Sequence, residues 1–105
     1  MPEAPRWKAL IEWDFGARGL WTDTLTESSG ETPDLRSLLS LDLLDDLHEW
    51  NREGEYLFGS VTPEDFNHKL PKFYEAAEKL ARRARSQLGP EWQVTYENGV
   101  GIQVI

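Results

Sequence analysis

Apolar residues recur at helical spacing between residues 71 and 88. A helix of about 3.6 residues per turn places them on one face, and charged residues occupy the opposite face. Pro71 suits the first turn of a helix, and Gly89-Pro90 is typical of the end of one. We expect a helix of about 17 residues that packs on a sheet. Its apolar positions are Phe73, Ala77, Leu80, Ala84 and Leu88.

After this helix, alternating residues on both sides of Asn98-Gly99 predict a hairpin. A two-residue loop at Asn98-Gly99 would leave apolar side chains on both faces. A three-residue loop, with Gly99 in the left-handed conformation, makes one face wholly apolar, so this register is expected. Its pairs are Tyr96 with Val100, Val94 with Ile102 and Trp92 with Val104.

Alternation at the N-terminal side predicts a half-buried strand from Trp7 to Phe15. Leu10 is the one apolar exception on the polar face of this strand, and it could cover a second, smaller hydrophobic cluster. Residues 16–19 read as a turn, and Leu20 to Leu25 as a second strand antiparallel to the first. Trp21 would then lie beside Trp13.

The middle of the chain predicts helices. We expect a polar loop at residues 26–33 and a short helical turn at 34–40. Ser40 is then expected to cap a helix from Leu41 to Glu53, which Gly54 would end. Residues 55–59 read as an extended connection. Thr62 and Pro63 then start another helix, and the pattern leaves open whether it breaks at Pro71.

Charge is unevenly distributed over the 105 residues, which carry 19 acidic and 11 basic side chains. Residues 1–66 hold fifteen acids and five bases, and residues 67–105 hold four acids and six bases. Such a field repels nucleic acid and anionic membranes and attracts a cationic partner. The absence of cysteine excludes thiolate metal sites. No apolar run spans a bilayer and no signal peptide is evident, so we expect a cytoplasmic protein.

Four carboxylates share one side of the helix predicted from Leu41: Asp42, Asp45, Asp46 and Glu49. The set lacks the glycine turn and spacing of an EF-hand, and nothing in the sequence indicates burial that would separate two carboxyl pKa values. The four residues, here named the acidic ridge, are therefore either a solvated face or a binding surface for Lys and Arg. Trp21, near a turn and beside the polar loop, is a further candidate contact.

Catalytic motifs are not evident. His48 and His68 lie on separate predicted helices without a nucleophile motif, and the glycines match neither a P-loop nor a dinucleotide fingerprint. We therefore expect no catalytic residue, metal ligand or cofactor. Arg82, Arg83 and Arg85 read as a solvated helix face rather than a nucleic-acid contact.

A set of scattered residues extends along most of the chain: Trp13, Gly19-Leu20-Trp21, Leu39-Ser40, Leu43, Trp50, Leu80-Ala81-Arg82, Gln87-Leu88-Gly89-Pro90-Glu91-Trp92, Val94 and Tyr96. This set resembles a pattern in small uncharacterised proteins of high-GC Gram-positive bacteria. The chain departs from this pattern at Leu38-Leu39-Ser40, where a Leu-Pro-Leu-Ser turn is usual. The resemblance implies a small α+β domain and no established activity. In acidity and size the chain is also similar to immunity proteins that neutralise toxins.

These observations predict one α+β domain over residues 1–105. A small, mainly antiparallel sheet, made of the N-terminal strand pair and the C-terminal hairpin, carries two or three helices on one face. The expected function is non-enzymatic binding of a basic protein, as by an immunity protein or inhibitor. The alternative is a small-molecule-binding or enzymatic domain with a pocket near Trp21, His48 and Tyr56. A homodimer through the edge strand at Val100–Ile105 is also open.

Overall fold

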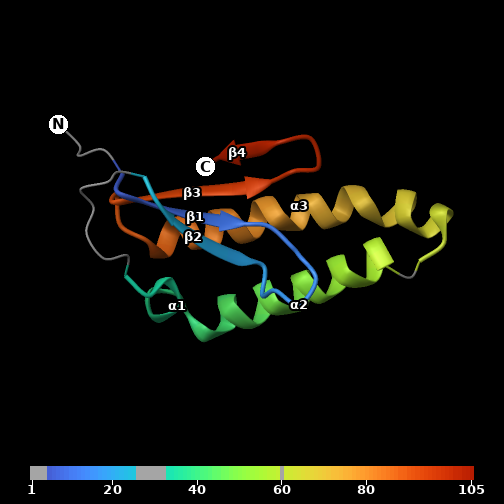
Figure 1. Cartoon of the computed structure of the whole chain (residues 1–105), viewed down its shortest axis with the longest axis horizontal. Coiled ribbons are helices and arrows are strands. Elements are labelled where there is room, and N and C mark those ends of the chain that lie inside the picture. Colours follow the sequence, from blue (N-terminus) through green and yellow to red (C-terminus); the bar gives the residue numbers. More distant parts are fainter. Residues whose placement is uncertain (1–4, 26–32, 60) are drawn as a thin grey trace.

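A computed structural model describes residues 5–25, 33–59 and 61–105. A four-stranded sheet in the order β2-β1-β3-β4 lies against two long helices, which cover one of its faces (Figure 1). β1 is antiparallel to β2 and parallel to β3, and β3 is antiparallel to β4, so the sheet is mixed. The predicted α+β class is confirmed. The elements are β1 (Trp7–Ile11), β2 (Leu20–Thr24), α1 (Leu35–Leu38), α2 (Leu41–Gly59), α3 (Pro63–Gln87), β3 (Trp92–Glu97) and β4 (Ile102–Val104).

The core lies between the two central strands and the long helices. Alternate residues of β1 and β3 point into it, and Ala9, Ile11 and Val94 have no exposed surface. From the helices, Phe73, Ala77 and other members of the predicted apolar stripe are buried against them. The helical spacing of the sequence therefore identified the packed face of α3 correctly.

α3 is longer than the sequence indicated, because the helix that starts at Pro63 continues through Pro71 to Gln87. Thr62 caps it as predicted, since its Oγ1 accepts a hydrogen bond from the backbone N–H of Asp65 at 3.3 Å. Leu88 is the C-cap, just before Gly89-Pro90. Pro71 is exposed, so its ring needs no room in the core.

The predicted end of the preceding helix is wrong. α2 passes through Gly54 and reaches Gly59, so residues 55–59 are helical and not extended. Gly54 is buried, and a Cβ there would lie 2.8 Å from Cγ of Trp13 and 2.9 Å from Cζ of Phe73. The glycine allows two aromatic rings to approach the helix closely, which is a tertiary requirement and not a termination signal.

The predicted hairpin register is also wrong. Thr95 pairs with Val104 and Glu97 with Ile102, across a four-residue loop at 98–101. Asn98 organises this loop, because its Oδ1 accepts from the backbone N–H groups of Val100 and Gly101, each at 3.0 Å. The side chains of Ile102 and Val104 consequently lie on the sheet face opposite the helices. Gly99 does have the expected positive φ, 95°.

The first strand is shorter than predicted, since β1 ends at Ile11. Trp13 and Phe15 belong to the connection to β2, which turns toward α2. The ring of Trp13 stacks on Phe58 of α2, with centroids 4.5 Å apart, rather than on Trp21. Asn51 of α2, fully buried, holds this connection through three hydrogen bonds: its Oδ1 accepts from the backbone N–H of Asp14, and its Nδ2 donates to the backbone oxygens of Asp14 and Ala17. Glu55 Oε1, on the same helix, also lies 3.1 Å from this Nδ2 and accepts from the backbone N–H of Gly16.

Candidate binding surface on the open sheet face

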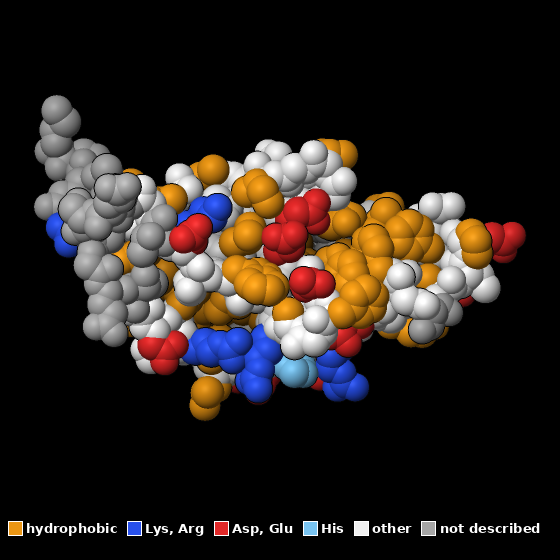
Figure 2. All heavy atoms as spheres, in the orientation of Figure 1, with side chains coloured by type: hydrophobic (Ala, Val, Ile, Leu, Met, Phe, Trp, Pro, Cys, Tyr) orange, Lys and Arg blue, Asp and Glu red, His pale blue; other side chains and the backbone are white. Residues whose placement is uncertain are grey.

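The sheet face turned away from the helices has no covering element among the described residues. We call it the open face. Figure 2 shows Asp and Glu side chains gathered in the middle of this view, with hydrophobic side chains on either side. The strand register places on it Lys8, Leu10, Trp21, Asp23, Gln93, Thr95, Glu97, Ile102 and Val104.

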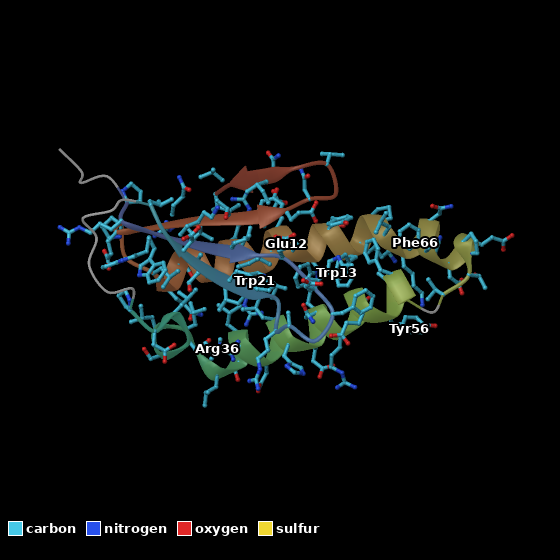
Figure 3. The ribbon with its side chains drawn as sticks, in the orientation of Figure 1. Glu12, Trp13, Trp21, Arg36, Tyr56 and Phe66 are labelled. Atoms are coloured by element: carbon cyan, nitrogen blue, oxygen red, sulfur yellow. The ribbon has the colours of Figure 1, made fainter. Side chains whose placement is uncertain are left out.

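Trp21 is the largest side chain on the open face, and 43% of its surface is exposed. Its Nε1 donates to the backbone oxygen of Glu12 at 2.9 Å, which orients the indole beside the end of β1. Figure 3 labels Trp21 and Glu12, which this hydrogen bond joins. A hollow of about 320 Å³ borders the indole and is lined by Lys8, Leu10, Glu12, Asp14, Trp21, Thr22 and Asp23.

An apolar row crosses the sheet beside this hollow. The register aligns Trp21, Leu10, Thr95 and Val104 on four successive strands. Thr95 is buried within the row, and its Oγ1 donates to the backbone oxygen of Ala9. Val104 is 64% exposed, so the row ends in an accessible apolar side chain. Leu10, the apolar exception that the sequence pattern showed on the polar face of β1, lies at its centre.

Three carboxylates border the row, from Glu12, Asp14 and Glu97. Partial burial raises the pKa of Glu12, and the negative charges of Glu97 and Asp14 raise it further, while Lys8 acts in the opposite direction. Burial likewise raises the pKa of Tyr74, with Glu97 and Glu12 adding to the effect. Burial is the largest cause of both shifts, and the neighbouring carboxylates add to it.

The three carboxylates, the indole of Trp21 and the neighbouring row can together bind a cationic side chain. A carboxylate forms charge-assisted hydrogen bonds with Lys or Arg, and the face of an indole attracts the same cations. The apolar row offers surface for the aliphatic part of such a side chain or for an apolar neighbour. Sequence reasoning missed Glu12, Asp14 and Glu97 as a group, because Glu97 is far from the other two along the chain.

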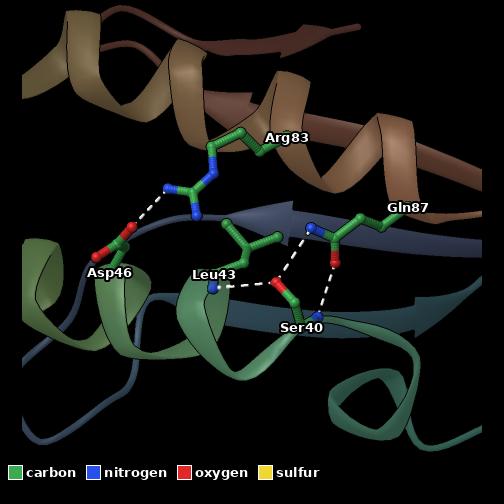
Figure 4. Close-up of polar contacts among 5 residues, drawn as sticks. All are labelled: Ser40, Leu43, Asp46, Arg83 and Gln87. Carbon is green, nitrogen blue, oxygen red and sulfur yellow. Dashed lines mark hydrogen bonds and ion pairs between the residues drawn. The ribbon is translucent and has the colours of Figure 1, made fainter.

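The acidic ridge lies elsewhere, on α2, and two of its members are already paired. Asp46 accepts from Arg83 of α3 at 2.6 Å, as Figure 4 shows beside the contacts of Ser40 with Leu43 and Gln87. Glu49 lies 3.4 Å from Arg52. Asp42 and Asp45 are exposed and form no ion pair within the described segments. Trp21 lines none of the hollows that the ridge residues line.

The three residues of the alternative pocket are also separated. Trp21 borders the open face, His48 a hollow beside α1, and Tyr56 a groove between α2 and α3. Among residues 5–25, 33–59 and 61–105, no group of His, Cys, Asp and Glu has a metal-binding arrangement. Within the same residues, no helix combines the length and the apolar character needed to cross a membrane.

Comparison with known proteins found no relative of this chain. No family model, no curated protein and no solved structure matches the chain. The resemblance to small proteins of high-GC Gram-positive bacteria therefore stays a prediction.

Proposed function

We propose that this chain is a non-enzymatic binding domain for a basic protein, in the manner of an immunity protein or inhibitor, and that the open face is its principal contact surface. A partner side chain with a positive charge would lie against Trp21 and near the carboxylates of Glu12 and Glu97. Apolar partner groups would cover Leu10 and Val104.

One observation carries this proposal: the carboxylates of Glu12, Asp14 and Glu97 border a row that exposes Trp21 and Val104 on a sheet face without covering helices. Acidic side chains alone are common on solvated surfaces. An exposed tryptophan in the same place is less common and is enriched in the energetic centres of protein interfaces. The net charge of −8 adds a field that speeds the approach of a basic partner.

The acidic ridge is the competing surface within the same proposal. Asp42 and Asp45 are available there, whereas a partner at Asp46 or Glu49 would compete with Arg83 or Arg52. The cytoplasmic location and the homodimer through β4 stay predictions.

The test is to capture a partner from the native cell extract at low salt, identify it, and measure the affinity of the purified pair. Each variant removes one surface: Trp21→Ala with Glu12→Gln and Glu97→Gln for the open face, and Asp42→Asn with Asp45→Asn, Asp46→Asn and Glu49→Gln for the ridge. We expect a basic partner whose affinity falls steeply with salt and at least tenfold in the open-face variant.

Two outcomes would contradict the proposal in different ways. A partner lost only in the ridge variant would move the interface to α2. A partner that is not basic, or an affinity independent of salt, would exclude the electrostatic mechanism on both surfaces. Circular dichroism of each variant checks that the fold is retained.

A further inference from the structure

A second hollow, of about 250 Å³, lies where the β1–β2 connection, α1 and the start of α2 meet. It is smaller than the roughly 300–1,000 Å³ of sites for drug-sized ligands, so its ligand would be small. Figure 2 shows Lys and Arg side chains and a histidine along the corresponding edge, and Figure 3 labels Arg36 there. The hollow is lined by Arg18, Leu20, Arg36, Leu41, Leu44, Asp45 and His48.

The two arginines of this hollow differ from the other five in the chain. Arg52, Arg82 and Arg83 each pair with a carboxylate, and the guanidinium of Arg85 donates to three backbone oxygens. Arg6 also has an interaction partner. The guanidinium groups of Arg18 and Arg36 have none within the described segments, although the chain has 19 acidic and 11 basic side chains.

Unpaired guanidinium groups that line one hollow are suited to a carboxylate, which an arginine can hold through two parallel hydrogen bonds. Asp45 lines the same hollow and forms no ion pair with either arginine, so it opposes a purely anionic ligand and suits one with an ammonium group. His48, half-buried, adds an imidazole as a further hydrogen-bonding group. Leu20, Leu41 and Leu44 supply an apolar wall.

We propose that this hollow binds a free aliphatic α-amino acid. The carboxylate lies at Arg18 and Arg36, the ammonium group at Asp45, and the aliphatic side chain against the three leucines. This inference is independent of the open face, whose residues take no part in it. Asp45 also belongs to the acidic ridge, so the two arginines, which are not ridge residues, distinguish this site from a partner surface on α2.

The test is a titration of the isotope-labelled protein with three probes, followed by NMR of the amides of residues 18, 36, 44, 45 and 48. L-Leucine carries all three groups, leucinamide lacks the carboxylate and 4-methylpentanoate lacks the ammonium group. We expect saturable shifts with L-leucine at these amides, and affinities about tenfold or more weaker for the other two probes.

Single variants test the individual contacts. Arg18→Gln, Arg36→Gln and Asp45→Asn should each weaken L-leucine binding about tenfold, since each removes a charge-assisted contact. Arg52→Gln is the control, because this arginine is on the same helix as Asp45 but lines a different hollow. Absence of saturation with L-leucine, equal binding of the three probes, or unchanged binding in the arginine variants would each overturn the proposal.

Discussion

Gly54 lies where the rings of Trp13 and Phe73 approach α2, and the ideal Cβ of any other residue would come within 3 Å of both. In an isolated helix, replacement of glycine by alanine stabilises by up to about 1 kcal/mol. Here steric overlap outweighs that gain, because real Cβ atoms do not approach aromatic carbons so closely.

We therefore expect Gly54→Ala to lower the free energy of unfolding by about 1–3 kcal/mol, measured by urea denaturation. Gly59→Ala is the matched control in the same helix, since its Cβ would meet Phe15 at an ordinary 3.6 Å. An equal effect of the two substitutions would show that backbone flexibility, and not ring packing, explains Gly54.

Asn51 is fully buried and satisfies three backbone groups of the connection between β1 and β2. Asn51→Ala would leave these groups without their partner, and we expect a loss of about 2–4 kcal/mol in unfolding free energy. Asn67→Ala, at an exposed position of α3, should change it by less than about 0.5 kcal/mol. Comparable losses at both positions would contradict the role assigned to Asn51.

At the scale of elements, α3 contains a proline in its interior, which removes one helical hydrogen bond. Pro71→Ala restores the N–H group at an exposed position, which stabilises the helix. It also removes the restriction that proline places on the unfolded chain, which opposes this gain. We expect the free energy of unfolding to rise by about 1–2 kcal/mol in total. Thermal and urea unfolding both measure this change.

Lys72→Ala is the control for Pro71, because it is the next residue and is also exposed. Its effect should stay within about 0.5 kcal/mol. A decrease in stability for Pro71→Ala would mean that the proline ring itself supports the packing of α3.

At the scale of the whole molecule, the open face brings together charges from distant segments. Glu12 has a pKa raised above its ordinary value of 4.5, first by burial and then by Glu97 and Asp14. The folded protein therefore binds a proton more readily than the unfolded chain. The contribution of Glu12 to the free energy of unfolding therefore falls as pH rises from about 4.5 to the raised pKa. Above that pKa the decrease is complete.

Glu12→Gln should remove this loss. Solvent screens this partly exposed carboxylate, so we expect the variant to exceed the wild type in unfolding free energy by no more than about 0.5 kcal/mol at pH 7, and the difference to vanish as pH falls below about 4.5. Chemical denaturation at a series of pH values measures it. Glu53→Gln, at an exposed position of α2, controls for the removal of one negative charge. A difference for Glu12→Gln that grows toward acid pH would contradict the sign of the shift.

Much of the local structure followed from the sequence. The apolar stripe of α3, the Thr62 cap, the end of α3 before Gly89-Pro90 and the existence of four strands all depend on residues a few positions apart. Such patterns are local, so periodicity and capping preferences identify them without knowledge of the partner surface.

Only the tertiary structure decided the rest. Gly54 is a contact point for two rings and not a helix end, the Asn98 loop sets a register that turns Ile102 and Val104 to the open face, and β1 pairs in parallel with β3. The same parallel pairing brings Glu97 near Glu12 and creates the candidate surface. The ring contacts of Gly54 and the parallel pairing depend on which distant segments pack together, and a pattern within one segment carries no information about its neighbour. The Asn98 loop is local, but alternation of apolar residues alone favoured a shorter loop and therefore the wrong register.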